Sequence, residues 1–278
     1  MIAQVLDIAT TAAILYVVSA GLLLVFGVMK IINFAHGALL TIGSYAAVVA
    51  GWLGLTPWLA LPCAAIVGAL TGIIIERVVV RPLYTRPLDA ILATWGLGIV
   101  IGQLLTIAFG RGVHFADSPL KGIVSVLGVD YSLYRLALVG VAVALGLCIS
   151  ALLSETRLGL ETRAVIMNED LARGIGINSG LVRFITFAVG SALAAAAGML
   201  ITPLSSVDPN MGVPWLVNAF MLVLVSGSSL LSLAIACLVL GGAQVLVSSY
   251  LSPVLGGLTI AVLAAVILRV RPRGFADA

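Results

Sequence analysis

Residues 209–268 read PNMGVPWLVNAFMLVLVSGSSLLSLAIACLVLGGAQVLVSSYLSPVLGGLTIAVLAAVIL, sixty residues without Asp, Glu, Lys or Arg. A membrane-crossing helix rises about 1.5 Å per residue and needs roughly 20 apolar residues to span the hydrocarbon core. The stretch therefore has room for three crossings. Turn-forming residues at Ser226–Ser229 and Ser252–Pro253 divide it. They predict helices near 215–225, 230–250 and 254–268.

The rest of the chain continues this pattern. Of its 278 residues, 62% are hydrophobic and only 9% charged, whereas a soluble domain carries about a quarter charged residues. Six more apolar runs, each about one membrane thickness long, precede the stretch: 8–29, 35–55, 58–75, 90–110, 136–153 and 184–204. The sequence predicts an all-α fold, a polytopic transmembrane helical bundle of eight or nine spans with short loops, in one domain over residues 1–278. Small residues, as in Gly190–Gly198, predict close helix packing.

Lysine and arginine are distributed unevenly over the predicted loops. Short loops rich in these residues stay in the cytoplasm, so the tail Arg269–Arg273 is placed inside. Alternating backwards from it puts 11 of the 14 Lys and Arg residues inside and leaves three, Arg111, Lys121 and Arg135, outside. This predicts a multi-pass membrane protein with a cytoplasmic C-terminus. Nine crossings would place the N-terminus outside, whereas one re-entrant run would give eight and reverse it.

The sequence lacks the signatures of enzymes and of ATP-binding proteins. Its two histidines, His36 and His114, belong to no HExxH motif and no Cys/His cluster, so we expect no metal site. Neither lysine lies in the GxxxxGK[ST] motif that binds ATP, and the net charge of +3 is too small to suggest nucleic acid. We expect a non-catalytic chain without a cofactor of its own, energised by another polypeptide. A sodium-coupled carrier stays open, because backbone carbonyls at broken helices can bind an ion.

The segment 155–183 is the longest predicted cytoplasmic loop, and it is amphipathic. From Leu160 onward, apolar residues recur every three or four positions, which places them on one face of a helix. They are Leu160, Ala164, Met167, Leu171 and Ile175. Gly174 and Gly176 are suited to end such a helix. A short amphipathic helix outside the membrane can insert its apolar face into the groove of a soluble partner or lie among lipid headgroups.

Polar but uncharged side chains in or beside the spans are candidates for a transport pathway. They can bind a small polar or zwitterionic solute without placing a fixed charge in lipid. The candidates are Asn33, His36, Thr94, Gln103, Asn218 and Gln244. Asn33 and His36 lie in Ile31–Gly37, where a break in the helix would leave backbone groups in need of partners. Each candidate could instead make a hydrogen bond between helices.

Several segments, in order along nearly the whole chain, resemble one family of transport proteins. They are Phe26–Met29 leading into Ile32–Gly37, Ile42–Tyr45, Ile75–Arg77 with Arg81–Leu83, Thr156–Gly159, Arg163–Ala164, Gly174–Asn178 and Arg271–Gly274. Together they are similar to the membrane permease subunits of ABC importers for branched-chain amino acids. That family also includes permeases for urea and short amides.

The resemblance implies an ATP-driven importer in a bacterial-type inner (plasma) membrane. The segment 155–183 would be the coupling loop that docks on the ATPase, through Leu160, Arg163, Ala164, Met167, Leu171, Gly174, Ile175 and Gly176. The partners would be two ATPase subunits, which bind ATP and Mg, a second related permease and a periplasmic substrate-binding protein. Branched-chain or other hydrophobic amino acids would be the substrate, with urea or short amides as the alternative.

Overall fold

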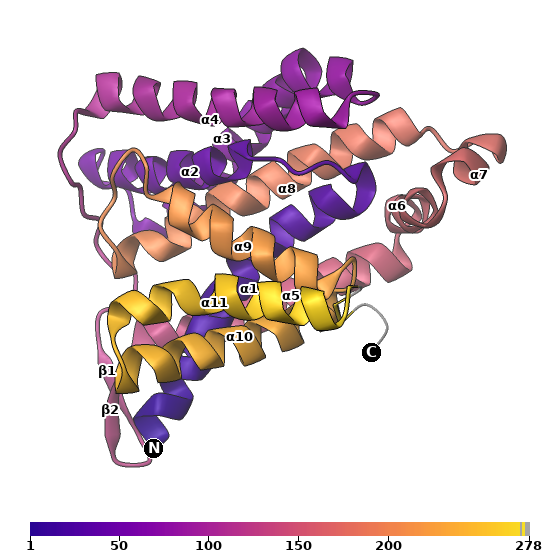
Figure 1. Ribbon diagram of the computed structural model, residues 1–278. Helices are drawn as coiled ribbons and strands as arrows, with labels where there is room; N and C mark the ends of the chain where they lie inside the picture. Colours follow the sequence, from indigo (N-terminus) through magenta and orange to yellow (C-terminus); the bar gives the residue numbers. More distant parts are fainter. Residues whose placement is uncertain (273, 276–278) are drawn as a thin grey trace.

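The computed structural model describes residues 1–272 and 274–275, and it is almost entirely helical (Figure 1). Its α-helices are α1 (Ile2–Met29), α2 (Ala35–Trp52), α3 (Pro57–Ile75), α4 (Pro87–Phe109), α5 (Leu133–Glu155), α6 (Arg157–Met167), α7 (Glu169–Gly174), α8 (Ser179–Ile201), α9 (Gly212–Ser226), α10 (Leu230–Tyr250) and α11 (Pro253–Val270). The predicted all-α fold is confirmed. Arg273, an arginine of the predicted cytoplasmic tail, lies outside the described residues.

Short irregular elements join the helices. A π-helical turn, η1 (Glu76–Val80), and a 3-10 turn, η2 (Arg81–Leu83), connect α3 to α4, and a second 3-10 turn, η3 (Thr202–Leu204), follows α8. Strands β1 (Ile123–Val126) and β2 (Val129–Ser132) precede α5 and pair as an antiparallel hairpin. All of these elements lie at the ends of long helices.

Seven of the described helices are long and apolar enough to cross a membrane, namely α1, α3, α4, α5, α8, α10 and α11. Two shorter helices complete the set: α2 has 18 residues and α9 has 15. Helix α9 begins at Gly212, three residues before the predicted start of its span at 215. Nine helices therefore run between the ends of the bundle, the upper of the two predicted counts.

The contacts between helix termini define the two ends of the bundle. At the hairpin end, the Gln4 amide donates a hydrogen bond to the Tyr250 hydroxyl (2.9 Å), and Arg135 pairs with Asp7 (3.2 Å). These contacts hold the start of α1 against α10 and α5, and Tyr131 of β2 also donates to Asp7 (2.8 Å). Helices α6 and α7 project from the opposite end, which we call the α6–α7 end (Figure 1). Most of the described lysines and arginines lie there, so the charge asymmetry of the sequence is also an asymmetry of the fold.

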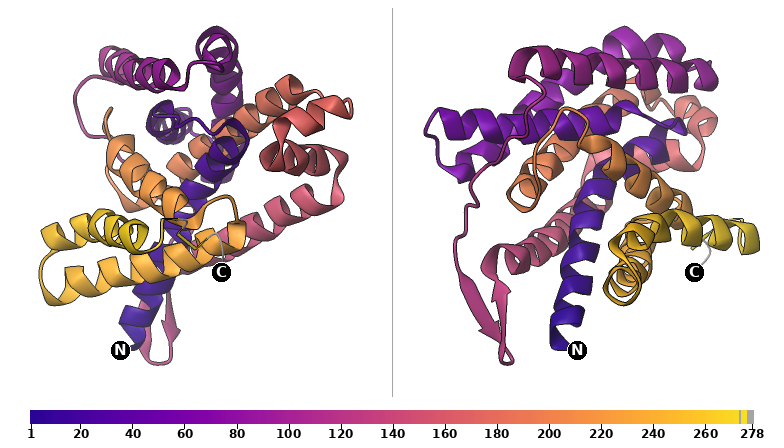
Figure 2. Two further views of the ribbon diagram at one scale, coloured as in Figure 1. Left: turned by 45° about the vertical axis from the view of Figure 1, so that its right-hand side comes forward. Right: turned by 60° about the vertical axis from the view of Figure 1, so that its left-hand side comes forward.

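Helix α1 runs through the middle of the bundle, and α8 packs against α1, α2 and α3 (Figure 2). Glycines bring these backbones into contact. A Cβ atom added at Gly21 of α1 would lie 2.7 Å from the carbonyl oxygen of Gly190, and one at Gly198 would lie 1.9 Å from that of Leu40. Lipid offers no hydrophobic drive for helix association, so packing of this kind holds the bundle together. The close packing predicted from Gly190–Gly198 is confirmed.

Candidate coupling surface and pathway

The segment 155–183 forms two helices, α6 and α7, and not the single amphipathic helix that the apolar spacing predicts. Asn168 separates them with an extended backbone (φ −158°, ψ 104°). Its side-chain oxygen accepts a hydrogen bond from the amide of Leu171 (3.0 Å), which caps the start of α7. Asn is a poor residue for a helix interior and a good N-cap, and the acidic Glu169 and Asp170 in the next turn favour a helix start. The prediction of one continuous helix was therefore wrong.

Most of the apolar residues predicted for coupling nevertheless lie on the uncovered side of both helices. Met167 is 85% exposed, Leu171 65% and Leu160 54%, while the opposite side packs Val165 and Ala172 against the bundle. Helix α7 ends at Gly174, and Gly176 then has a positive φ of 90°, as the predicted glycine stop requires. The remaining predicted coupling residues are exposed, apart from the half-buried Ala164: Arg163, Gly174, Ile175 and Gly176. We call the exposed predicted set the coupling surface.

The break between α1 and α2 involves three of the predicted pathway residues. Lys30 ends α1 with a left-handed backbone (φ 54°). The amide of Phe34 donates to the Thr94 hydroxyl (3.2 Å) and that of Ala35 to the Asn33 side-chain oxygen (3.0 Å). Asn33 and Thr94 thus supply the partners that a break inside a membrane protein needs.

The third of these residues, His36, is fully buried in the first turn of α2. Its Nε2 atom lies 3.1 Å from the carbonyl oxygen of Val18 and donates a hydrogen bond to it. Its Nδ1 atom has no partner among the described residues. His36 therefore ties α2 to α1, and no surface of its ring is open to a solute.

The other three pathway candidates lie apart from this break. Gln103 is exposed on α4, Asn218 is half-buried on α9 and Gln244 is half-buried on α10, where its Oε1 atom is buried without a partner among the described residues. Helices α4 and α9 each pack against α2, so Gln103 and Asn218 belong to the two helices that flank it. Of the six candidates, Asn33, His36 and Thr94 are brought together at the α1–α2 break, and the other three lie elsewhere.

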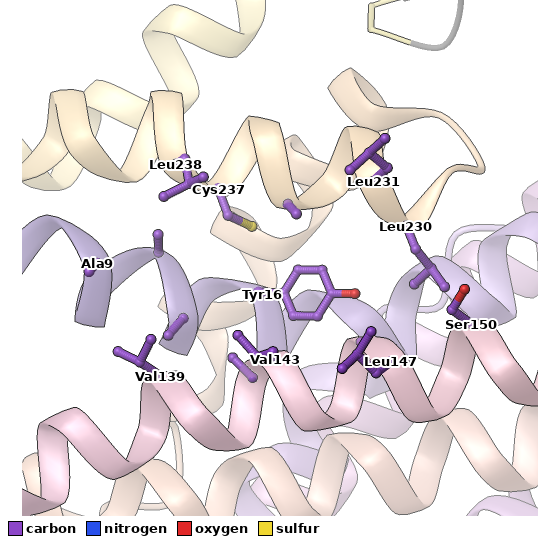
Figure 3. Close-up of a pocket in the computed structure, with 15 residues that line it drawn as sticks. Ala9, Tyr16, Val139, Val143, Leu147, Ser150, Leu230, Leu231, Cys237 and Leu238 are labelled. Atoms are coloured by element: carbon purple, nitrogen blue, oxygen red, sulfur yellow. The ribbon is translucent and has the colours of Figure 1, made fainter.

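A separate apolar crevice of about 500 Å³ opens between α1, α5 and α10 (Figure 3). Tyr16 lies between the helices, with its hydroxyl directed along the crevice towards Leu230 and Ser150. The other lining residues are mostly alanine, valine and leucine. Such a lining offers few partners to a carboxylate or an ammonium group, so the crevice suits aliphatic chains better than a zwitterion.

A polar cluster at the α6–α7 end was not anticipated from the sequence as a functional feature. Glu76 and Tyr84 from the α3–α4 connection lie together with Glu169 of α7 and Arg183 of α8. The signal available in the sequence was Glu76, a carboxylate directly after an uncharged span. A charged residue directly after a span is typical of an anchor in the lipid headgroups, where it would be exposed to water. Glu76 is instead only 1% exposed.

A largely helical bundle whose described residues include seven helices long and apolar enough to cross a membrane, with exposed apolar residues at its cationic end, is the architecture of a polytopic membrane protein. Comparison of the sequence with known families narrows this class to one family. A family model described as branched-chain amino acid transport system / permease component matches residues 4–270, and the chain belongs to that family.

Individual relatives agree with this assignment. The high-affinity branched-chain amino acid transport system permease protein LivH of Salmonella typhimurium is 29% identical, over 92% of this chain and 89% of that protein. The corresponding protein BraD of Pseudomonas aeruginosa is also 29% identical, over 94% and 92%. Among solved structures, PsaBC from Streptococcus pneumoniae in complex with Fab matches with a TM-score of 0.52 over 95% of this chain and 91% of that one. At 15% identity that likeness concerns the fold alone.

Proposed function

We propose that this chain is one of two permease subunits of an ATP-driven importer for branched-chain or other hydrophobic amino acids. The observation that carries the proposal is the family match over nearly the whole chain, residues 4–270. The chain performs no covalent chemistry. Two ATPase subunits bind ATP and Mg, and a periplasmic substrate-binding protein delivers the amino acid.

Energy enters through the coupling surface. Leu171 and Met167 expose apolar area that a groove on the ATPase can bury, which is the way amphipathic helices bind soluble partners. Closure of the ATPase pair would displace α6 and α7 and switch the pathway between outward and inward access. The α6–α7 end, with the C-terminus, would then face the cytoplasm of a bacterial-type inner membrane, in line with the positive-inside rule.

The substrate would enter from the hairpin end and pass between the two permeases. Gln103 and Asn218, on the helices that flank α2, are polar without charge. They can hydrogen-bond a zwitterionic amino acid without the cost of a fixed charge in lipid. The same chemistry would serve urea or a short amide, so the substrate needs a direct test.

The test is to purify the intact complex with its binding protein and identify the ligand that the binding protein retains. We expect leucine, isoleucine or valine, and uptake of radiolabelled leucine into proteoliposomes that depends on ATP and on the ATPase subunits. Urea or a short amide on the binding protein would overturn the substrate assignment. Uptake by this chain alone, driven by a sodium gradient, would establish a secondary carrier and overturn the importer itself.

A further inference from the structure

Four side chains form a continuous chain of contacts at the α6–α7 end, which we call the junction cluster: Glu169, Arg183, Tyr84 and Glu76. Glu169 belongs to α7, Arg183 to α8, and Tyr84 and Glu76 to the connection between α3 and α4. The cluster therefore links the coupling loop to α3 and α4, two helices that lie far from α7 in the sequence.

Each contact in the junction cluster is specific. The Arg183 Nη2 atom donates to the Glu169 carboxylate in an ion pair. The guanidinium of Arg183 lies 4.7 Å from the centre of the Tyr84 ring, within the range of a cation–π interaction. The Tyr84 hydroxyl donates to Oε1 of Glu76. The path from α7 to the end of α3 thus consists of two charge-assisted hydrogen bonds and one aromatic contact.

A second contact holds the same two segments together. Arg77, which follows Glu76, places its guanidinium 5.4 Å from the ring centre of Phe184, which follows Arg183. Each segment therefore contributes one cation and one aromatic ring to the other. Because the two contacts are adjacent, the start of α8 and the α3–α4 connection are expected to move together.

Burial makes the junction cluster dependent on its own members. Glu76 is 1% exposed, and its Oε2 atom has no partner among the described residues, nor has Nε of Arg183. A buried charge that loses its partner is strongly destabilised. Burial and the hydrogen bond to Glu76 raise the pKa of Tyr84, so the phenol keeps its proton and remains the donor. A change at Glu169 or Arg183 would thus alter the contacts of Tyr84 and, through its hydrogen bond, the position of the Glu76 carboxylate.

The backbone at Glu76 departs from an ordinary helix. Residues Glu76–Val80 form the π-helical turn η1, with the amide of Arg81 bonded to the carbonyl of Glu76. Turns of this kind are rare and frequently occur at functional sites. Here the π-helical turn separates α3 from η2 and α4, so a change in its geometry would alter the angle between two crossings.

We propose that Arg183 and Tyr84 are positioning residues that transmit displacement of α7 to the junction of α3 and α4. The proposal rests on the proposed function, since it takes the ATPase as the source of the displacement. The transmission is a mechanical linkage of packed, hydrogen-bonded side chains between two elements, the physical form that energetic coupling between distant sites takes.

The test compares Glu169→Gln and Tyr84→Phe with wild type in the complete complex. Both variants keep side-chain size and remove one contact of the junction cluster. Uptake of radiolabelled leucine per ATP hydrolysed is expected to fall about fivefold in each, while the ATPase subunits still co-purify. Arg86→Gln is the matched control, because it removes an exposed Arg–Asp pair, Arg86–Asp89, at the same end of the bundle (3.8 Å). An unchanged ratio, or equal losses of uptake and ATP hydrolysis, would overturn the proposal.

A second measurement is independent of transport. In the detergent-purified permease, hydrogen exchange at the backbone amides of Arg77–Arg81 should accelerate in Glu169→Gln and stay at the wild-type rate in Arg86→Gln. Unchanged exchange in Glu169→Gln would refute the linkage even if the importer works. Failure of wild-type uptake together with accelerated exchange would refute the proposed function and leave the linkage standing.

Discussion

Single glycines set how closely α8 approaches its neighbours. A Cβ atom added at Gly43 of α2 would lie 1.8 Å from the carbonyl oxygen of Ala195, so no side chain fits unless a backbone moves. At Gly140 of α5, by contrast, nothing lies within 4 Å of the added atom. Both residues are helical, and glycine is a poorer helix former than alanine. The packing therefore requires glycine at the first position and only tolerates it at the second.

Gly43→Ala should destabilise the folded chain by about 1–3 kcal/mol, the usual cost of adding a methyl group to a tightly packed contact. Gly140→Ala should leave stability unchanged or raise it by up to about 1 kcal/mol, because it improves helix propensity at an open site. Thermal unfolding of the two variants in the same detergent measures the difference. Equal unfolding temperatures would show that the α2–α8 contact can relax around a methyl group.

At the scale of secondary-structure elements, the sequence predicts where the spans lie but not the local structure of the segments that connect them. Uncharged windows located all nine crossing helices, because lipid excludes charge over the full length of a span. The spacing from Leu160 to Ile175 continues through Asn168 unbroken, so the α6–α7 break was visible only in the identity of one capping residue. The π-helical turn at Glu76 has no such pattern. Neither has the contact of Tyr84 with Arg183, which depends on tertiary packing.

The sequence predicted the exposure of most residues of the coupling surface, but it predicted one helix where the structure has two. Leu160 and Leu171 were expected on one face of one helix, and they are exposed on two helices. One helix or two would expose the same apolar side chains, because Val165 on α6 and Ala172 on α7 pack against the bundle and leave the opposite side of each helix uncovered. Sequence periodicity therefore identified which side faces outward, while the orientation of α7 relative to α6 followed from Asn168.

Leu171→Asp should weaken binding of the ATPase by about tenfold or more, since it places a charge where a partner groove buries apolar area. The spans should still insert, because Leu171 is 65% exposed and lies on α7, outside the membrane-length helices. Co-purification of tagged permease with the ATPase subunits is the measurement. Leu127→Asp is the matched control: Leu127 is equally apolar, is 82% exposed and lies in the hairpin turn. Loss of ATPase binding in both variants would indicate misfolding, and retention in both would refute the coupling surface.

At the scale of the whole molecule, charge and architecture point to one orientation. Helix α1 begins and helix α11 ends at opposite ends of the bundle (Figure 1), and the end with α6 and α7 holds most of the described lysines and arginines. At the hairpin end, Asp7 accepts a hydrogen bond from Tyr131 (2.8 Å) and also pairs with Arg135. An importer needs these ends to differ, because it receives its substrate on one side of the membrane and its energy on the other.

The orientation can be measured with single cysteines in a chain whose Cys63, Cys148 and Cys237 have been replaced by alanine. Val5→Cys and Leu127→Cys should react with a membrane-impermeant maleimide on intact spheroplasts, because both positions are exposed at the hairpin end. Asp170→Cys, on α7, should react only after the membrane is opened. Labelling at Val5 is the decisive result, since a helix between Val5 and α7 that failed to cross would place both on the same side. If Val5→Cys and Asp170→Cys are protected together while Leu127→Cys reacts, one of the helices between Val5 and Leu127 does not cross, and α2, the shortest of those four, becomes the helix to examine.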